Sequence, residues 1–154
     1  MNDIGPAHPA QTPVAQRTDG FVSGAPGVIL RLEGAAVLAA AALAYAQVGQ
    51  GWKVFAILFL VPDLSMLGYL FGPRVGAAAY NTAHSYILPA ALGASGALLH
   101  QPYAIAGALI WIAHVGFDRL LGYGLKYSTA FGHTHLGLAH LGLATGRRAR
   151  AKSA

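Results

Sequence analysis

Four apolar stretches occupy most of the chain between Val28 and Leu121. Each has about 20 residues, which is long enough to cross roughly 30 Å of hydrocarbon as an α-helix. The stretches are Val28–Val48, Trp52–Phe71, Val75–Leu99 and Tyr103–Leu121. The links between them are very short, and short links force consecutive helices to run antiparallel. The pattern therefore predicts an all-α fold, a transmembrane up-down four-helix bundle.

The composition agrees with a membrane protein. Hydrophobic residues make up 55% of the 154-residue chain and charged residues only 10%, whereas a soluble domain carries about 25% charged residues. Cysteine is absent from the sequence. Disulfides, thiolate metal sites and thiol catalysis are therefore excluded.

The two ends of the chain differ from the bundle. Residues 1–26 are rich in proline, alanine, glycine and polar residues without hydrophobic periodicity, which predicts a disordered tail. Residues 27–122 form the predicted transmembrane domain. Residues 123–154 are apolar but broken by glycines and end in the basic run RRARAK. We expect this last segment to be cytoplasmic or to lie at the membrane interface.

Lysine and arginine predict the orientation. With four spans, both tails and the middle link lie on one side, which collects every basic residue except Lys53. Those residues are Arg17, Arg31, Arg74, Arg119, Lys126, Arg147, Arg148, Arg150 and Lys152. The positive-inside rule then places both termini in the cytoplasm of a multi-pass inner-membrane protein. Membrane lipids are the expected partners, and nucleic acid is not expected because topology explains the basic residues.

Acidic residues show the most informative distribution. The chain has five of them, and Asp3 and Asp19 fall in the predicted tail. The other three, Glu33, Asp63 and Asp118, lie inside predicted spans. An ionisable side chain within a membrane is costly and points to the bundle interior or to a functional site.

Two histidines accompany these acids at similar depth. His114 and Asp118 are four residues apart, so they project from one face of the fourth span. His84 lies in the third span. At 1.5 Å per residue, the three acids and two histidines lie roughly 5–14 Å below the cytoplasmic boundary. Four helices thus bring carboxylate or imidazole groups into one slab of the membrane.

Residues near these acids and histidines support the prediction of a functional site. Pro62 should kink the second span and redirect Asp63, and Pro89 offers a break in the third span. Asn81, His84 and Ser85 share one helix face at positions i, i+3 and i+4. The residues expected to support the site are Asn81, Ser85, Arg119 and His135.

Carboxylates with imidazoles suit a divalent metal such as Zn, Fe or Mn. We expect His84, His114 and Asp118 as first ligands, with Asp63 as ligand or general base. Glu33 is expected to contact a metal ligand without binding the metal itself, or to shuttle protons. Asp63 and Glu33 are therefore the candidate catalytic residues. The alternative is a purely structural network in which arginines pair with the acids.

Three functions fit these residues. The first is a metal-dependent membrane enzyme, with hydrolysis preferred over oxidation, acting on a lipid-like or amphipathic substrate. The second is a proton- or cation-handling carrier that uses the same groups as a relay. The third is a haem b protein ligated by His84 and His114.

Several motifs resemble a known family. They are RLEG, PDLSMLGY, YNTAHSY, HVGFDRLLGYGLKY and HTHLG, within Leu30–Gly137. The sequence resembles a bacterial family of small four-helix membrane proteins that is catalogued as a domain of unknown function. The resemblance implies the fold and a membrane location, and it implies no activity or cofactor. The motif positions include Glu33, Asp63, Asn81, His84, His114, Asp118, Arg119 and Lys126.

Overall fold

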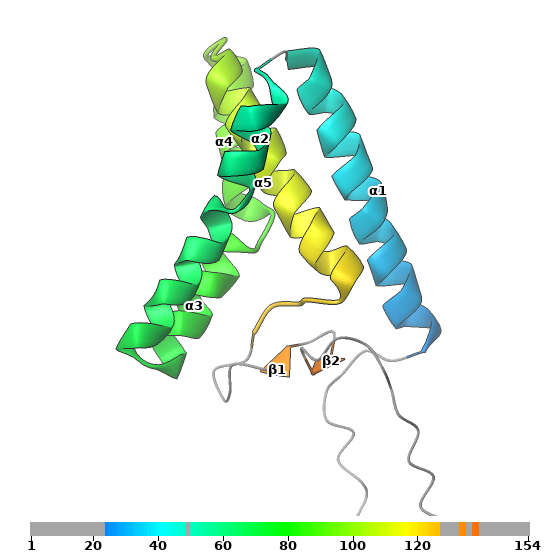
Figure 1. The fold of residues 1–154 in the computed structure, drawn as a ribbon, viewed down its shortest axis with the longest axis vertical. Helices are drawn as coiled ribbons and strands as arrows, with labels where there is room; N and C mark the ends of the chain where they lie inside the picture. The colour runs from blue at the N-terminus through cyan, green and yellow to red at the C-terminus, as the bar shows by residue number, and fades with distance from the viewer. Residues whose placement is uncertain (1–23, 49, 127–132, 135–136, 139–154) are drawn as a thin grey trace, which may run out of the picture.

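The computed structural model of the chain describes residues 24–48, 50–126, 133–134 and 137–138. Most of the predicted tail 1–26 and of the segment 123–154, including His135, lies outside these residues. The described residues form helices joined by short links, together with one short antiparallel pair of strands, β1 (His133–Thr134) and β2 (Gly137–Leu138). The prediction of an all-α bundle is confirmed (Figure 1).

The first and last helices of the bundle pack closely together. They are α1 (Ala25–Val48), which begins two residues inside the predicted tail, and α5 (Pro102–Leu121). A Cβ built on Gly34 of α1 would lie 2.8 Å from the carbonyl oxygen of Gly116 in α5. One built on Gly116 would lie 2.8 Å from the backbone nitrogen of Leu38. Glycine at both positions therefore permits the close helix contact that membrane bundles favour.

The second span changes its helix type midway. It consists of α2 (Trp52–Phe59) and the 3₁₀ helix η1 (Val61–Phe71). Pro62 stands in the first turn of η1, where it has no N–H to continue the hydrogen bonds of α2. The break in the regular helix expected beside Asp63 is thus a change from α to 3₁₀ geometry. Beyond it, η1 packs on α3 rather than on α5, so Figure 1 shows the two leaning away from the lower half of α5.

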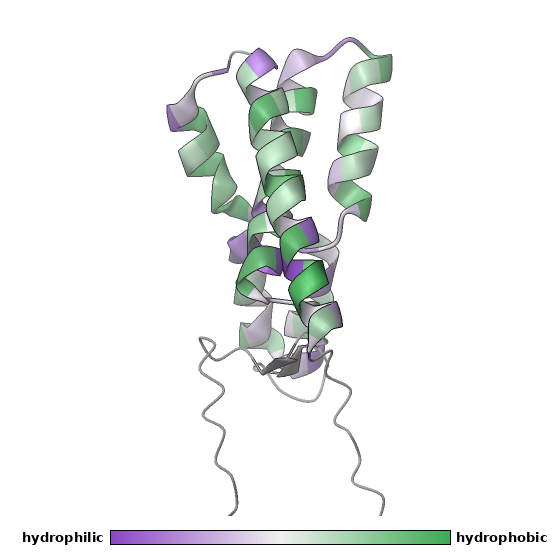
Figure 2. Ribbon diagram, turned by 90° about the vertical axis from the view of Figure 1, so that its right-hand side faces the viewer, coloured by the Kyte–Doolittle hydropathy of each residue, from purple (hydrophilic) through white to green (hydrophobic). Residues whose placement is uncertain are grey.

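The third span is broken in two. It consists of α3 (Pro73–Ala83) and α4 (Ile87–Leu98), which packs on α5. Pro89 falls in the first turn of α4, where a missing N–H costs nothing. The break predicted near this proline is confirmed, and it lies at residues 84–86. Figure 2 shows hydrophilic residues about halfway along the bundle, between hydrophobic stretches.

The bundle has the dimensions of a membrane protein. Three helical segments are long and apolar enough to cross a membrane: Ala25–Val48, Trp52–Phe71 and Pro102–Leu121. The halves of the third span are 11 and 12 residues long, too short to cross alone. Large apolar side chains point outward, among them Leu43, Leu70 and Leu98. Lipid is the environment that such a surface requires.

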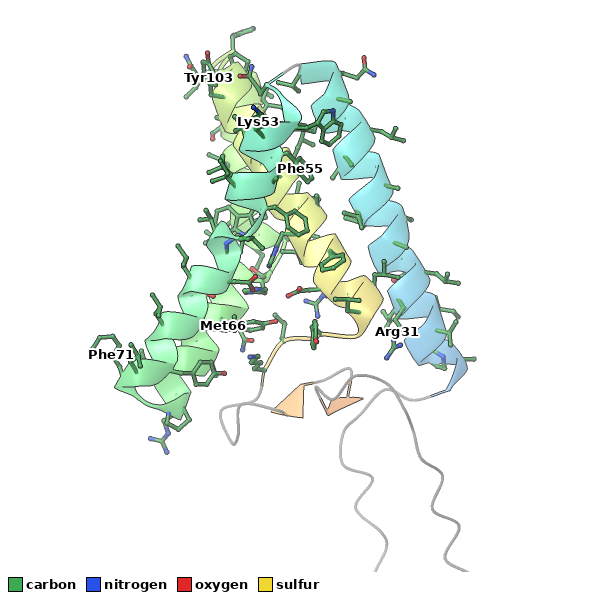
Figure 3. The ribbon with its side chains drawn as sticks, in the orientation of Figure 1. Arg31, Lys53, Phe55, Met66, Phe71 and Tyr103 are labelled. Carbon is green, nitrogen blue, oxygen red and sulfur yellow. The ribbon has the colours of Figure 1, made fainter. Side chains whose placement is uncertain are left out.

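The start of α1 and the end of α5 lie at the same end of the bundle (Figure 1). Figure 3 shows Arg31 towards this end and Lys53 at the opposite one. This arrangement matches the even number of crossings expected from the sequence. The cytoplasmic placement of the termini stays a prediction.

An apolar core fills the end of the bundle away from the termini. Tyr45 and Ile110 are buried at its centre, and the Tyr45 hydroxyl donates a hydrogen bond to the Gly51 carbonyl at 2.8 Å. Phe55 stacks on Phe59, with ring centroids 5.6 Å apart. Figure 3 shows the Phe55 side chain directed into the bundle. The core therefore closes this end with aromatic and aliphatic groups.

Candidate metal centre

The break in the third span exposes the end of α3 to the bundle interior, and His84 caps that end. The residue is buried, and its Nδ1 lies 2.9 Å from the Tyr80 carbonyl oxygen. A carbonyl oxygen only accepts, so Nδ1 carries the proton. Nε2 of the neutral ring is then left with its lone pair. Fixing the tautomer through the remote nitrogen is the usual arrangement for a metal-binding histidine.

His114 meets His84 from α5. It is buried, and its Nε2 lies 3.2 Å from the Nε2 of His84. Phe59 packs edge-on against the His114 ring, with centroids 5.1 Å apart. The His114 Nδ1 makes no hydrogen bond among the described residues. No neighbour there fixes its tautomer, so its Nε2 is able to donate a proton to His84 or to act as a ligand.

Asp63 completes a three-residue cluster. Its Oδ1 lies 3.5 Å from the His84 Nε2 and 3.6 Å from the His114 Nε2. Each of the three residues offers one ligand atom, and these atoms lie within 4.8 Å of one another. We call Asp63, His84 and His114 the triad. The Asp63 side chain retains 37% exposure, so the triad is accessible from one side.

A second carboxylate stands beside the triad. Asp118 Oδ2 lies 3.5 Å from the His84 Nε2 and 3.9 Å from the His114 Nε2, and it accepts a hydrogen bond from the Tyr80 hydroxyl at 3.1 Å. The Tyr80 ring also stacks on the His84 ring, with centroids 3.7 Å apart. Tyr80 therefore orients both an imidazole and a carboxylate of the site.

Side chains from α5 satisfy the backbone at the break. The Trp111 indole N–H donates to the Ala83 carbonyl at 2.6 Å, and Arg119 donates to the His84 carbonyl at 3.4 Å. A helix end within a membrane needs such partners because lipid offers none. These bonds allow α3 to stop where His84 faces the interior.

A pocket of about 380 Å³ opens beside the triad. Asp63, Tyr80, His114, Asp118 and Lys126 are its polar lining. The apolar lining consists of Phe59, Leu60, Met66, Phe117 and Leu121, with Tyr123 also at the wall. A pocket of this size, mostly apolar with a few convergent polar groups, is typical of a small-molecule site.

The chain after α5 forms one wall of this pocket. Gly122 ends α5 with φ 89°, and the Tyr123 N–H bonds to the Asp118 carbonyl at 2.7 Å, which is a Schellman ending. The Asn81 side chain then holds the backbone of Lys126 by two hydrogen bonds. Its Nδ2 donates to the Lys126 carbonyl at 2.9 Å, and its Oδ1 accepts from the Lys126 N–H at 2.7 Å.

Four of the candidate residues from the sequence come together: Asp63, His84, His114 and Asp118. Glu33 does not join them. It lies exposed on α1, and it is absent from the pocket lining and from the ion pairs of the described residues. A catalytic role for Glu33 stays an untested prediction.

The supporting residues have varied positions. Asn81 and Arg119 contact neighbouring backbone, as described above. The Ser85 hydroxyl bonds to the Thr82 carbonyl at 3.3 Å, away from the pocket. His135 lies outside the described residues.

No sequence pattern assigned a site role to Tyr80, Trp111 or the side chain of Lys126. Tyr80 precedes His84 by four residues, and that spacing could have placed it on the same helix face. The Trp111 bond depends on a carbonyl freed by the break. Lys126 reaches the pocket only because the chain turns at Gly122, and its position carries no periodic signal.

Fold and site together define a small α-helical membrane protein with a buried histidine–carboxylate cluster that is able to hold a metal ion. The chain belongs to the family described as a domain of unknown function, DUF4260, whose model matches residues 27–139. No curated protein and no solved structure shows significant similarity to it.

Proposed function

We propose that this chain is a metal-dependent membrane enzyme, a hydrolase of amphipathic substrates, with the triad as its metal site. One observation carries the proposal. The three ligand atoms of the triad are 3.2, 3.5 and 3.6 Å apart. Two ligands at the tetrahedral angle on bonds of about 2.0–2.2 Å are themselves about 3.3–3.6 Å apart. The triad thus has the dimensions of one face of a tetrahedral site.

The ligand types agree with this geometry. Two imidazoles and one carboxylate, with a further position open, are the protein ligands of many catalytic zinc sites and of non-haem iron sites. Zn, Fe and Mn are therefore the candidate ions. When bound, such an ion supplies an activated water at neutral pH and polarises a carbonyl or phosphoryl oxygen.

Asp118 supplies the proton acceptor in this proposal. It lies beside the triad without belonging to it, and the Tyr80 hydroxyl holds its Oδ2. A carboxylate held at this point is suited to take a proton from an attacking water. In this proposal Asp63 is a ligand, which is one of the two roles expected for it from the sequence, and Asp118 is the base instead of the ligand expected there.

The same geometry disfavours the other two functions. Axial nitrogens of a haem would stand about 4 Å apart, twice a metal–nitrogen bond, with the macrocycle between them. The nitrogens of His84 and His114 are 3.2 Å apart and face carboxylates. A transmembrane carrier needs a polar path beyond the site. Phe55, Phe59 and Ile110 pack there instead.

A hydrolysis assay tests the proposal. Detergent-purified protein, stripped of metal and then loaded with Zn, Fe or Mn, is offered 4-nitrophenyl decanoate and bis(4-nitrophenyl) phosphate. We expect metal-dependent cleavage of at least one ester, and Asp118→Asn should reduce it by about 10²–10⁴-fold, the usual worth of a general base. His100→Ala, in the link between α4 and α5, should retain full activity. Equal rates with and without metal would contradict the proposal.

A further inference from the structure

We propose that the pocket beside the triad binds the oxyanion head group of an amphiphile, and that Lys126 is the residue that selects it. The inference rests on the proposed function, because it names the substrate class of the same site. It identifies the ligand as a single-chain molecule with a carboxylate or phosphate at its polar end.

The position of Lys126 carries the argument. The residue is 8% exposed and lines the pocket together with Asp63 and Asp118. Its Nζ lies 4.2 Å from the centroid of the Tyr80 ring and 5.3 Å from that of Tyr69. Lysine is among the residues least often buried. Here the ammonium is held inside the protein against two aromatic rings, at the wall of a cavity.

The backbone holds Lys126 there independently of its side chain. Asn81 makes its two hydrogen bonds to the N–H and carbonyl of Lys126. The His84 ring covers one face of the Tyr80 ring at 3.7 Å, so the ammonium lies over the other face. The cation lines the same pocket as Asp63 and His114 of the triad. A ligand in this pocket is therefore able to contact both the ammonium and the triad.

Charge favours an anion once the metal is present. The carboxylates of Asp63 and Asp118 contribute two negative charges, and Lys126 contributes one positive charge. These three groups give the pocket a net charge of minus one. A divalent ion changes the net charge of the pocket to plus one. Burial lowers the pKa of Lys126 below its usual value, and the two carboxylates offset only part of that effect. A bound oxyanion adds a further charge that keeps the ammonium protonated.

The remaining lining suits an alkyl chain. Phe59, Leu60, Met66, Phe117 and Leu121 surround the polar groups with apolar surface. Each methylene buried on such surface raises affinity by about fourfold. The pocket therefore offers separate contacts for a head group and for a tail, and inorganic phosphate alone would use only the first.

Calorimetric titration in neutral detergent tests the inference. The probes are decyl phosphate, decanol and inorganic phosphate, added to metal-loaded protein at one low salt concentration. We expect decyl phosphate to bind at least about tenfold more tightly than decanol, as one charge-assisted hydrogen bond would provide. Weaker binding of inorganic phosphate identifies the amphiphile as the source of the head group. Equal binding of both phosphates would leave the oxyanion site but overturn the amphiphile.

Variants make the test specific. Lys126→Gln should lose about tenfold in affinity for decyl phosphate and leave decanol unchanged, while Lys126→Arg should retain the preference. The fold of the Lys126→Gln protein should persist because Asn81 bonds only to the backbone of residue 126. A melting curve checks this. Lys53→Gln, at the other end of the bundle, is the matched control. Affinity of Lys126→Gln within about twofold of the parent would overturn the inference.

The metal content of each sample separates the two proposals. Protein that binds metal without a Lys126-dependent preference for decyl phosphate overturns the oxyanion site and leaves the metal site standing. Protein that binds no metal overturns the metal site. A Lys126-dependent preference in that metal-free protein would still support the oxyanion site.

Discussion

The Nε2 atoms of His84 and His114 face each other at 3.2 Å, although 30 residues separate the two histidines in the chain. Because the His84 Nε2 has a lone pair, this contact needs a proton from His114 or a shared cation. Two carboxylates converge on the same atoms. A metal site requires a shared cation between these atoms. A structural network, the competing explanation, requires a proton donated by His114.

Tyr80 should position the proposed base, Asp118. Replacing Tyr80 by Phe removes the hydroxyl bond to Asp118 but keeps the ring that stacks on His84. Because Asp118 is the base and not a metal ligand, we expect metal-dependent ester hydrolysis to fall by up to about 10²-fold, while the metal content stays unchanged. The rate of 4-nitrophenyl ester cleavage measures it. Tyr103→Phe, an exposed position, should leave the rate unchanged, and an unchanged rate in Tyr80→Phe would contradict the role given to its hydroxyl.

Trp111 should stabilise the break in the third span. Trp111→Phe leaves the part-buried Ala83 carbonyl without its indole partner, which should cost about 1–3 kcal/mol because lipid offers no replacement donor. Thermal unfolding in detergent should show a lower midpoint. Trp52→Phe is the matched control because Trp52 is 58% exposed. Equal midpoints for the two variants would mean that the hydrogen bond at the break contributes no net stability.

Gly116 should tolerate no side chain. In Gly116→Ala the new methyl group would overlap backbone of α1 near Leu38, and overpacking of this kind costs about 1–3 kcal/mol. Gly107→Ala, in the same helix, meets only Leu92 at 3.9 Å and should be neutral or stabilising. Melting midpoints compare the two. A Gly116→Ala protein as stable as Gly107→Ala would contradict the close contact of α1 and α5.

Asn81 should hold the wall of the pocket. Asn81→Ala removes both hydrogen bonds to the Lys126 backbone, so the Lys126 amide should exchange its hydrogen faster. Hydrogen exchange followed by mass spectrometry reports on this segment. Thr82→Ala removes an exposed hydrogen bond one residue away and should leave the rate unchanged. Slow exchange in Asn81→Ala would show that other contacts hold the segment.

The helical stretches, the links and the common level of four polar side chains along the bundle could be predicted from the sequence, because they follow from helix length and rise per residue. Asp63, His84, His114 and Asp118 share a slab and meet in the structure. Rotation about the helix axis could not be predicted. The apolar residues of α1 are spread over all of its faces, so no polar stripe distinguishes its outer face from its inner one. Depth alone thus placed Glu33 with the others, whereas Gly34 is the residue that faces α5.

The 3₁₀ geometry of η1 and the site roles of Tyr80 and Lys126 also went unpredicted. Pro62 predicts a kink, but the helix type beyond it depends on packing against α3. Lys126 depends on the direction that the chain takes after Gly122. A glycine predicts where a helix stops, and it does not predict where the chain goes next.

Metal content tests the central claim most directly. The protein is purified in detergent without chelator, loaded with Zn, Fe or Mn, desalted, and analysed for bound metal per chain. We predict roughly one ion per chain, because the triad offers a single set of ligands. His84→Ala and His114→Ala should lose that ion, while His100→Ala should keep it because His100 lies in the link beyond α4. Protein that stays metal-free after loading, or that keeps its metal in His114→Ala, would contradict the account.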